Sequence, residues 1–305
     1  MSYKIFSDSD VSQCLQMPKA IAAVMSAFQA KVSGKLIAPA RHHVEFADKG
    51  SLVFTIGGSI GSSNLAGFRV YDTFKGDSPD RNQFVAVFDA ETAAFKGIVI
   101  GELLGAMRTG AIGGAAIQLM ARKNAQRVGI IGSGLQAKTQ LLAAAAVRNL
   151  TTVKVFSRSP ENRTKFAIEM SAKLELEVTS VDSAKEAVTN SDIVICATTS
   201  DRPVFDHSWL APGSHVNTVG PKFKGRHELD PKVAETAKVI ATDSPQQIKG
   251  YTKEFFLSGT ADFDRIKDLT DFLVYPLERN DTDISLFCSA GLAGTEVFVA
   301  ATLFE

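Results

Sequence analysis

Apolar side chains recur first at helical spacing and then in short strand-like runs. Residues 9–33 begin with Asp and Ser and then carry apolar side chains at near-helical spacing, which predicts one helix that ends before Gly34. Runs typical of strands follow over residues 37–46, 51–56, 67–74, 84–88 and 95–100. Turn signals at 48–50, 75–79 and 89–92 separate several of these runs, so residues 35–100 predict a largely antiparallel sheet.

The segment 102–122 has a helical period but is unusually rich in Gly and Ala. Gly110, Gly113 and Gly114 lie inside this predicted helix. Each of them costs a helix about 1 kcal/mol relative to Ala. We therefore expect another backbone or a ligand to come close to this helix and offset the cost.

From residue 128 onward, apolar runs alternate with helical stretches. The predicted strands cover residues 128–131, 153–156, 177–178, 193–197, 215–219 and 239–242. Such alternation is typical of a parallel, doubly wound sheet. Residues 285–305 have helical spacing and a wide apolar face, which we expect to pack back on the front of the chain. The predicted fold class is α/β: a Rossmann-type sheet in residues 119–284, and an α+β domain in residues 1–118 and 285–305.

The sequence RVGIIGSGLQA, residues 127–137, contains the pattern G-x-G-x-x-A between a predicted strand and a predicted helix. In dinucleotide-binding folds the first Gly permits a tight turn, the second lets the pyrophosphate approach the backbone, and the small third residue lets helix and strand pack closely. The helix that follows directs its free N–H groups at the phosphates. We therefore expect cofactor contacts from Gly132, Ser133, Gly134, Leu135, Gln136 and Ala137.

The end of the second strand of such a fold distinguishes NAD from NADP, because a carboxylate there binds the ribose 2′-hydroxyl and repels a 2′-phosphate. This chain has Ser157, Arg158 and Ser159 at that point, and no carboxylate before Glu161. Two hydroxyls flanking a guanidinium suit a phosphate. The sequence therefore favours NADP(H). The alternative is that Arg158 stacks on adenine and that NAD(H) binds as well.

The composition of the chain limits the classes of binding partner that we expect. The 305 residues include 33 basic and 33 acidic ones, so no net charge favours nucleic acid or an anionic membrane. Cys14, Cys196 and Cys288 are widely spaced and are interpreted as reduced core residues. The first residues lack the pattern of a secretory signal, and no apolar stretch is long enough to span a membrane. We expect a cytoplasmic protein whose partners are small molecules and like subunits.

Several segments resemble the ornithine cyclodeaminase/μ-crystallin family: the Arg41 segment, GFRVYDTF, AMRTGAIGGAA, GIIGSGLQA, ICATTS, VGPKFKGRHELD and SAGLAGTEV. The resemblance implies a homodimer in which residues 1–118 and 285–305 bind substrate and dimerise, while residues 119–284 bind NAD(P). It implies hydride exchange at the α-carbon of an amino or imino acid. It also implies further cofactor contacts, from Arg108, Thr109, Ala197, Thr198, Thr199, Val219, Gly220 and Gly291.

Two arginines from different elements indicate an anionic substrate. Arg41 lies in a predicted strand, where it shares a face with His43 and Glu45, and Arg108 lies near the start of the Gly-rich helix. Guanidinium groups that converge clamp a carboxylate through bidentate hydrogen bonds. The family resemblance places its carboxylate-binding arginines on these two positions. Because His42 points to the opposite face of the strand, we expect no metal site there.

Two positions depart from the family pattern. Arg69 stands where the family usually has a lysine that binds the carboxylate and moves a proton, and arginine is a poor acid or base. Lys222 stands where cyclodeaminases have a catalytic aspartate, which argues against cyclodeamination. Lys222 either donates a proton to an imine nitrogen, binds a second carboxylate or is a solvated loop residue. The other proton sources are His43, Tyr71 and water.

The sequence therefore predicts an NAD(P)H-dependent reductase that converts an α-imino acid into an L-amino acid, with Arg41, Arg69 and Arg108 holding the carboxylate. Arg69 and Lys222 are the catalytic candidates. Cyclic ketimines and an acidic imine such as iminosuccinate are both compatible with these residues. The choice between them is expected to depend on loops such as 57–63 and 249–264. The rival interpretations are an ornithine cyclodeaminase that recycles NAD, and a non-enzymatic NADPH-binding protein of the crystallin kind.

Overall fold

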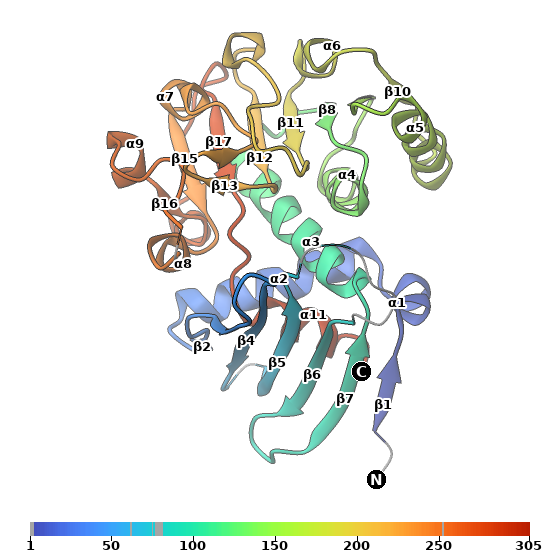
Figure 1. The fold of residues 1–305 in the computed structure, drawn as a ribbon, viewed down its shortest axis with the longest axis vertical. Coiled ribbons are helices and arrows are strands. Elements are labelled where there is room, and N and C mark those ends of the chain that lie inside the picture. The colour runs from blue at the N-terminus through green and yellow to red at the C-terminus, as the bar shows by residue number, and fades with distance from the viewer. Residues whose placement is uncertain (1–2, 62, 75, 77–81, 252) are drawn as a thin grey trace. The chain divides into compact units, whose positions relative to one another are not determined.

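The chain divides into two compact units (Figure 1). A computed structural model describes residues 3–61, 63–74, 76, 82–251 and 253–305; the predicted turn at 75–79 lies largely outside these residues. The first unit comprises Met1–Ala111 and Gly291–Glu305, and the second comprises Ile112–Ala290. The sequence predicts boundaries after residues 118 and 284. The unit boundaries in the structure, after residues 111 and 290, differ from these predicted ones. One reason is that helix α3 (Leu103–Met120) contributes to both units, and the other is that Ser285–Cys288 forms a strand of the second unit.

The first unit is built on a seven-stranded sheet in the order β1-β7-β6-β5-β4-β2, with β3 also paired to β4. Apart from the parallel pair of β1 and β7, neighbouring strands are antiparallel, which confirms the prediction for residues 35–100. The strands are β1 (Lys4–Phe6), β2 (Leu36–Ile37), β3 (His42–Glu45), β4 (Ser51–Ser59), β5 (Leu65–Asp72), β6 (Phe84–Asp89) and β7 (Phe95–Ile100). Arg41 therefore lies one residue before a strand and not within it.

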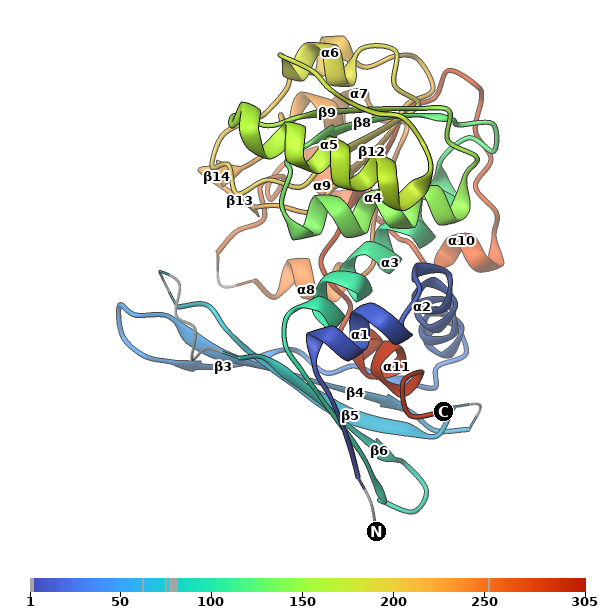
Figure 2. The same cartoon turned by 90° about the vertical axis from the view of Figure 1, so that its right-hand side faces the viewer.

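The front helix is two helices, α1 (Asp8–Cys14) and α2 (Met17–Val32), so the prediction of one continuous helix is wrong. Leu15 and Gln16 adopt extended backbone conformations, and Pro18 follows in the first turn of α2, where its missing N–H costs nothing. Together with α11 (Thr295–Ala301), α2 covers one face of the sheet (Figure 2).

The opposite face of this sheet is apolar. Cross-strand pairing puts Ile56, Phe68, Ala86, Ile98 and Ile5 in one row, and Phe54, Val70, Phe84 and Ile100 in the next. Several of these side chains are exposed, including Ile5 at 59% and Ile56 at 51%. The strands thus alternate between a helix-covered side and an open apolar side.

The second unit contains an eight-stranded, entirely parallel sheet in the order β10-β9-β8-β11-β12-β17-β15-β16. Its strands are β8 (Arg127–Ile131), β9 (Thr152–Phe156), β10 (Val178–Ser180), β11 (Ile193–Cys196), β12 (His215–Thr218), β15 (Val239–Thr242), β16 (Lys267–Asp268) and β17 (Ser285–Cys288). The order reverses between β8 and β11, which is the switch point where doubly wound sheets bind ligands. The prediction of a parallel, doubly wound sheet is confirmed, but it missed β16 and β17.

Alternate residues of the central strands enter two hydrophobic cores on the two sides of this sheet. Ile130, Val155 and Ile195 pack with residues of α3, α4 and α5, whereas Val194 and Ile240 pack with residues of α7 and α8. The remaining elements are α4 (Leu135–Val147), α5 (Pro160–Leu174), α6 (Ala184–Val188), α7 (Lys232–Thr236), α8 (Pro245–Lys249), α9 (Ala261–Asp264), α10 (Asp271–Val274), a 3-10 turn (His207–Trp209) and the hairpin of β13 (Lys222–Phe223) and β14 (Arg226–His227).

Cys196 and Cys288 are buried, but Cys14 is exposed and is not a core residue. Gly113 packs against the amide of Gln140, so at this position of α3 the close neighbour is a side chain and not a backbone or a ligand. No helix within the described residues is both long and apolar enough to cross a membrane.

Candidate active site

The first unit brings the three predicted arginines into one cluster. Arg41 donates from Nη2 to the Gly291 carbonyl at 2.6 Å and from Nη1 to the Tyr71 hydroxyl at 3.2 Å. A Cβ atom built on Gly291 would lie 2.7 Å from Nη1 of Arg108 and 2.9 Å from Nη2 of Arg41. Gly291, whose φ of +77° also favours glycine, therefore marks the point where the two guanidinium groups converge.

Arg69 completes this cluster from strand β5. Its guanidinium donates to Gln83, and it lies over the ring of Tyr71, 4.8 Å from the centroid. Burial, followed by repulsion from Arg108, lowers the pKa of Arg69 to about 10, although Glu296 opposes this shift. Gly105 of α3 packs against this guanidinium, and a side chain there would displace it. Arg69 is thus a half-buried cation that is still protonated at neutral pH.

Glu296 is the carboxylate of the cluster, and it is only 1% exposed. It accepts a hydrogen bond from the Thr55 hydroxyl and lies 3.9 Å from Nε of Arg108. Burial alone would raise its pKa, but Arg108, Arg69 and the Thr55 bond outweigh that effect and hold the pKa below its ordinary value. Arg108 and Arg69 act on this one carboxylate, and Arg41 is a third guanidinium in the cluster, so its positive charge is in excess and suits an anionic ligand.

The predicted cofactor turn, residues 132–137, has the geometry expected of a G-x-G-x-x-A sequence. Gly132 has a φ of +116° and packs against the Ala197 carbonyl, so a side chain there would clash. Gly134 is the N-cap of α4, and a Cβ atom on it would meet no heavy atom within 4 Å, which leaves space for a pyrophosphate. Ala137 is fully buried against the sheet. These three residues fit a dinucleotide.

The loop after β9 is tied to this turn by hydroxyl groups. Ser133 donates to Ser157 at 3.0 Å, and Ser157 donates to the Ser159 carbonyl at 3.1 Å. Ser159 also caps α5 by accepting from the Asn162 amide at 3.2 Å. Arg158 between them is exposed. The side chains at 157–159 are hydroxyls and one cation, which fits the prediction of a phosphate-binding loop.

Glu228 organises the loops at the carboxyl ends of β11 and β12. It is fully buried and accepts five hydrogen bonds: from the Thr198 amide and hydroxyl at 2.8 and 2.7 Å, from the Thr218 hydroxyl at 2.8 Å, and from the amides of Val219 and Gly220 at 3.1 and 2.6 Å. Thr198, Val219 and Gly220 are predicted cofactor contacts, as are their neighbours Ala197 and Thr199. Sequence reasoning missed Glu228, because its partners lie 8 to 30 residues away, beyond the reach of any local pattern.

Lys222 is only 7% exposed, so the interpretation as a solvated loop residue is wrong. Its ammonium donates to the carbonyls of Val219 at 2.9 Å and Gly220 at 2.5 Å. Glu228 binds the amides of the same two residues. Two oppositely charged side chains thus hold the peptide groups of this one loop.

Some predicted cofactor contacts belong to the first unit and not to the second, which holds the cofactor turn. Thr109 donates to the Gly105 carbonyl at 2.9 Å, and together with Arg108 and Gly291 it belongs to the first unit, so the contact of these three with a cofactor stays a prediction. His42 and His43 are exposed on β3. Across the described residues, no group of three or more His, Cys, Asp or Glu side chains is arranged to hold a metal ion.

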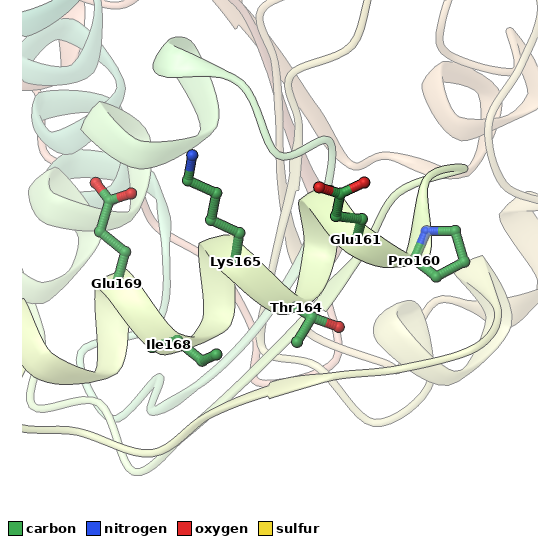
Figure 3. A pocket seen from close by; sticks show the side chains of 6 residues that line it. All are labelled: Pro160, Glu161, Thr164, Lys165, Ile168 and Glu169. Atoms are coloured by element: carbon green, nitrogen blue, oxygen red, sulfur yellow. The ribbon is translucent and has the colours of Figure 1, made fainter.

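A surface pocket lies along α5 (Figure 3). Its lining residues all belong to that one helix: Pro160, Glu161, Thr164, Lys165, Ile168 and Glu169. Ile168 is 68% exposed, and none of the six is a predicted site residue. This pocket is therefore not part of the candidate active site.

A parallel sheet with a glycine-rich turn at its switch point defines the class of dinucleotide-binding proteins. The chain belongs to the ornithine cyclodeaminase/mu-crystallin family, whose model matches residues 2–305. The alanine dehydrogenase of Archaeoglobus fulgidus is 28% identical over 314 residues, which cover 100% of this chain and 95% of that protein.

Two solved structures support this assignment. The Δ1-pyrroline-2-carboxylate reductase of Thermococcus litoralis, in complex with NADH and L-proline, superposes with a TM-score of 0.88 and 30% identity over 98% of this chain and 96% of its own. An archaeal alanine dehydrogenase dimer with bound NAD gives a TM-score of 0.86 and 25% identity over 100% and 95% of the two chains.

Proposed function

We propose that this protein reduces the C=N bond of an α-imino acid to an L-amino acid at the expense of NAD(P)H. The observation that carries the proposal is the convergence of Arg41 and Arg108 at Gly291, with the half-buried Arg69 in the same cluster. Relatives that bind L-proline or are named alanine dehydrogenase support the same substrate class. The excess of positive charge in the cluster further favours an α-imino acid with an acidic side chain over one with an uncharged side chain.

Each residue of the site has a defined part in this proposal. When bound, the nicotinamide supplies the hydride. Arg41 and Arg108 hold the substrate carboxylate by bidentate hydrogen bonds, and Arg69 adds positive charge and fixes the orientation of the imine plane. Lys222 stabilises the loop of Val219 and Gly220 and places a cation there. A cation at 222 also disfavours cyclodeamination, because that reaction lacks its expected aspartate.

We propose that NADP(H) is preferred and that NAD(H) also binds. The support is the exposed Arg158 between the hydroxyls of Ser157 and Ser159 at the end of β9. A 2′-phosphate placed there would be bound by the Arg158 guanidinium and the Ser159 hydroxyl, because the Ser157 hydroxyl already donates to the Ser159 carbonyl. A ribose 2′-hydroxyl would find no carboxylate acceptor in these three residues. The solved relatives named above contain NADH or NAD.

We further propose a homodimer that forms through the open apolar face of the first unit's sheet. Exposed apolar faces of this kind mark protein interfaces. A second copy of the chain is the occupant, because the face is nearly free of charged side chains, as in obligate interfaces, and because the archaeal relative is a dimer.

The test of the reaction is direct. Purified protein and NADPH are offered pyruvate with ammonia, oxaloacetate with ammonia, Δ1-pyrroline-2-carboxylate and a cyclic six-membered ketimine, and the loss of absorbance at the nicotinamide band is followed. We expect oxidation with at least one of these substrates and a rise in KM of roughly 100-fold in Arg108→Met, from loss of a charge-assisted contact. No oxidation with any of them refutes the proposal.

A further inference from the structure

Reduction of an imine needs a proton at nitrogen as well as a hydride at carbon, and the arginine cluster contains few groups that can give one. Arg41 and Arg108 keep their protons at neutral pH. Burial lowers the pKa of Arg69 to about 10, but its guanidinium donates to Gln83 and lies over the Tyr71 ring, and loss of its proton would remove a positive charge from the carboxylate clamp. Glu296 is buried, has a lowered pKa and is therefore ionised. Thr55 and Gln83 carry no acidic proton. Among the described residues that form this cluster, Tyr71 is the remaining acid.

We propose that Tyr71 is the catalytic acid that protonates the imine nitrogen, an inference that rests on the proposed function. Tyr71 lies on β5, two residues after Arg69 and on the same face of the strand. Its hydroxyl is 3.2 Å from Nη1 of Arg41, and the Arg69 guanidinium lies over its ring. It is half-buried, so solvent can return its proton.

The direction of the hydrogen bond to Arg41 leaves the phenol proton for another acceptor. Guanidinium nitrogens only donate, so the Tyr71 oxygen accepts from Arg41, and its own O–H must serve a different group. In an α-imino acid the nitrogen is attached to the carbon that bears the carboxylate. An acid beside the carboxylate clamp is therefore within reach of that nitrogen.

The hydride from NAD(P)H forms the new C–H bond, the electron pair of the C=N π bond moves to nitrogen, and that pair takes the proton as the phenol O–H bond breaks. The resulting phenolate lies beside Arg41 and Arg69, whose positive charges stabilise it. Water then returns a proton to the phenolate. In the reverse direction the same phenolate is the base that removes a proton from the amino acid.

The test is Tyr71→Phe, which keeps the ring and removes the hydroxyl. General acid catalysis is worth roughly 10²- to 10⁴-fold, so kcat should fall by about that factor while KM for the imine changes only a few-fold. The difference from the parent protein should narrow as pH falls, because an imine that is already protonated in solution needs no acid. Tyr275→Phe is the matched control, since Tyr275 is 76% exposed.

Two further measurements separate catalysis from binding. Calorimetric titration with the product amino acid should give affinities within a few-fold for the parent and Tyr71→Phe, which also shows that the variant is folded. Lys222→Met should keep the pH profile of the parent. Unchanged kcat in Tyr71→Phe, or loss of the pH dependence in Lys222→Met alone, overturns the assignment of Tyr71. If the parent protein reduces no imine, the proposed function is refuted, and the assignment of Tyr71 as catalytic acid is refuted with it.

Discussion

Replacement of Glu228 by Gln tests whether the loops after β11 and β12 receive the nicotinamide half of the cofactor. The variant keeps the size of the side chain but removes its charge and one acceptor oxygen. Glu228 contacts these loops and not the turn at Gly132 or the loop at Ser157. The change should therefore affect one half of the dinucleotide site selectively.

The magnitude follows from the five hydrogen bonds. Glutamine can keep the three bonds at one oxygen, but its NH2 group then faces the Thr198 amide, which loses its acceptor inside the protein. An unsatisfied buried donor costs about 1–3 kcal/mol, and the remaining bonds weaken as the charge is lost. We expect about 2 kcal/mol of this to appear in cofactor binding, which corresponds to roughly 30-fold.

The assay compares whole and truncated ligands. Dissociation constants are measured by calorimetry for NADPH and NADH, and for the matching ADP-ribose compounds that lack the nicotinamide. Glu228→Gln should bind the whole cofactors roughly 30-fold more weakly and the truncated ones as the parent does. Equal weakening of both kinds of ligand would refute the reasoning.

Asp192 provides the control. It is also a buried carboxylate in the same unit, and it accepts from the amides of Gln126 and Arg127, both at 3.0 Å, and from the guanidinium of Arg122 at 2.7 Å. It lies just before β11, at the amino end of the strand, whereas Thr198 lies beyond the carboxyl end. Asp192→Asn should therefore lower the melting temperature without separating whole from truncated ligands.

Three further outcomes are expected. Arg158→Ser should weaken NADPH binding roughly 10- to 100-fold, by loss of a charge-assisted phosphate contact, and leave NADH binding nearly unchanged, as measured by fluorescence titration. Phe68→Asp on the open sheet face should give a monomer in sedimentation velocity, whereas Ile168→Asp on α5 should not; a dimeric Phe68→Asp protein would contradict the proposed interface. Burial lowers the pKa of His215 to about 3, so the unfolded chain binds a proton near pH 6.5 that the folded chain does not. The free energy of unfolding should then fall by about 1.4 kcal/mol per pH unit between roughly pH 6 and pH 4, and urea titrations of His215→Gln should lack this component.

Sequence reasoning succeeded where local chemistry decides the structure. The turn from Gly132 to Ala137 could be predicted because a φ of +116° at Gly132 and a buried small residue at Ala137 leave few alternatives. The runs that became β4 to β7 were recognisable because turns and alternating apolar residues enclose them. The sequence also favoured the convergence of Arg41 and Arg108, but only through the family resemblance.

The remaining features depend on partners that are distant along the chain. Glu296 lies in an apolar segment, and its role follows from Arg108 and Thr55, which only the fold brings near. Strand β17 is four residues long and buried on both faces, so periodicity cannot distinguish it from the start of a helix. The break at Leu15 and Gln16 depends on two extended residues between segments that share one helical pattern.

Successive residues of strand β5 have different roles, because their side chains lie on opposite faces of the sheet. Arg69 and Tyr71 point to the helix-covered side with the charged cluster, while Phe68 and Val70 point to the open side. A single-residue insertion in this strand would exchange the two sets and place apolar side chains in the charged cluster. Engineering of substrate preference along β5 must therefore proceed by substitution, and each round of selection should monitor quaternary structure together with turnover.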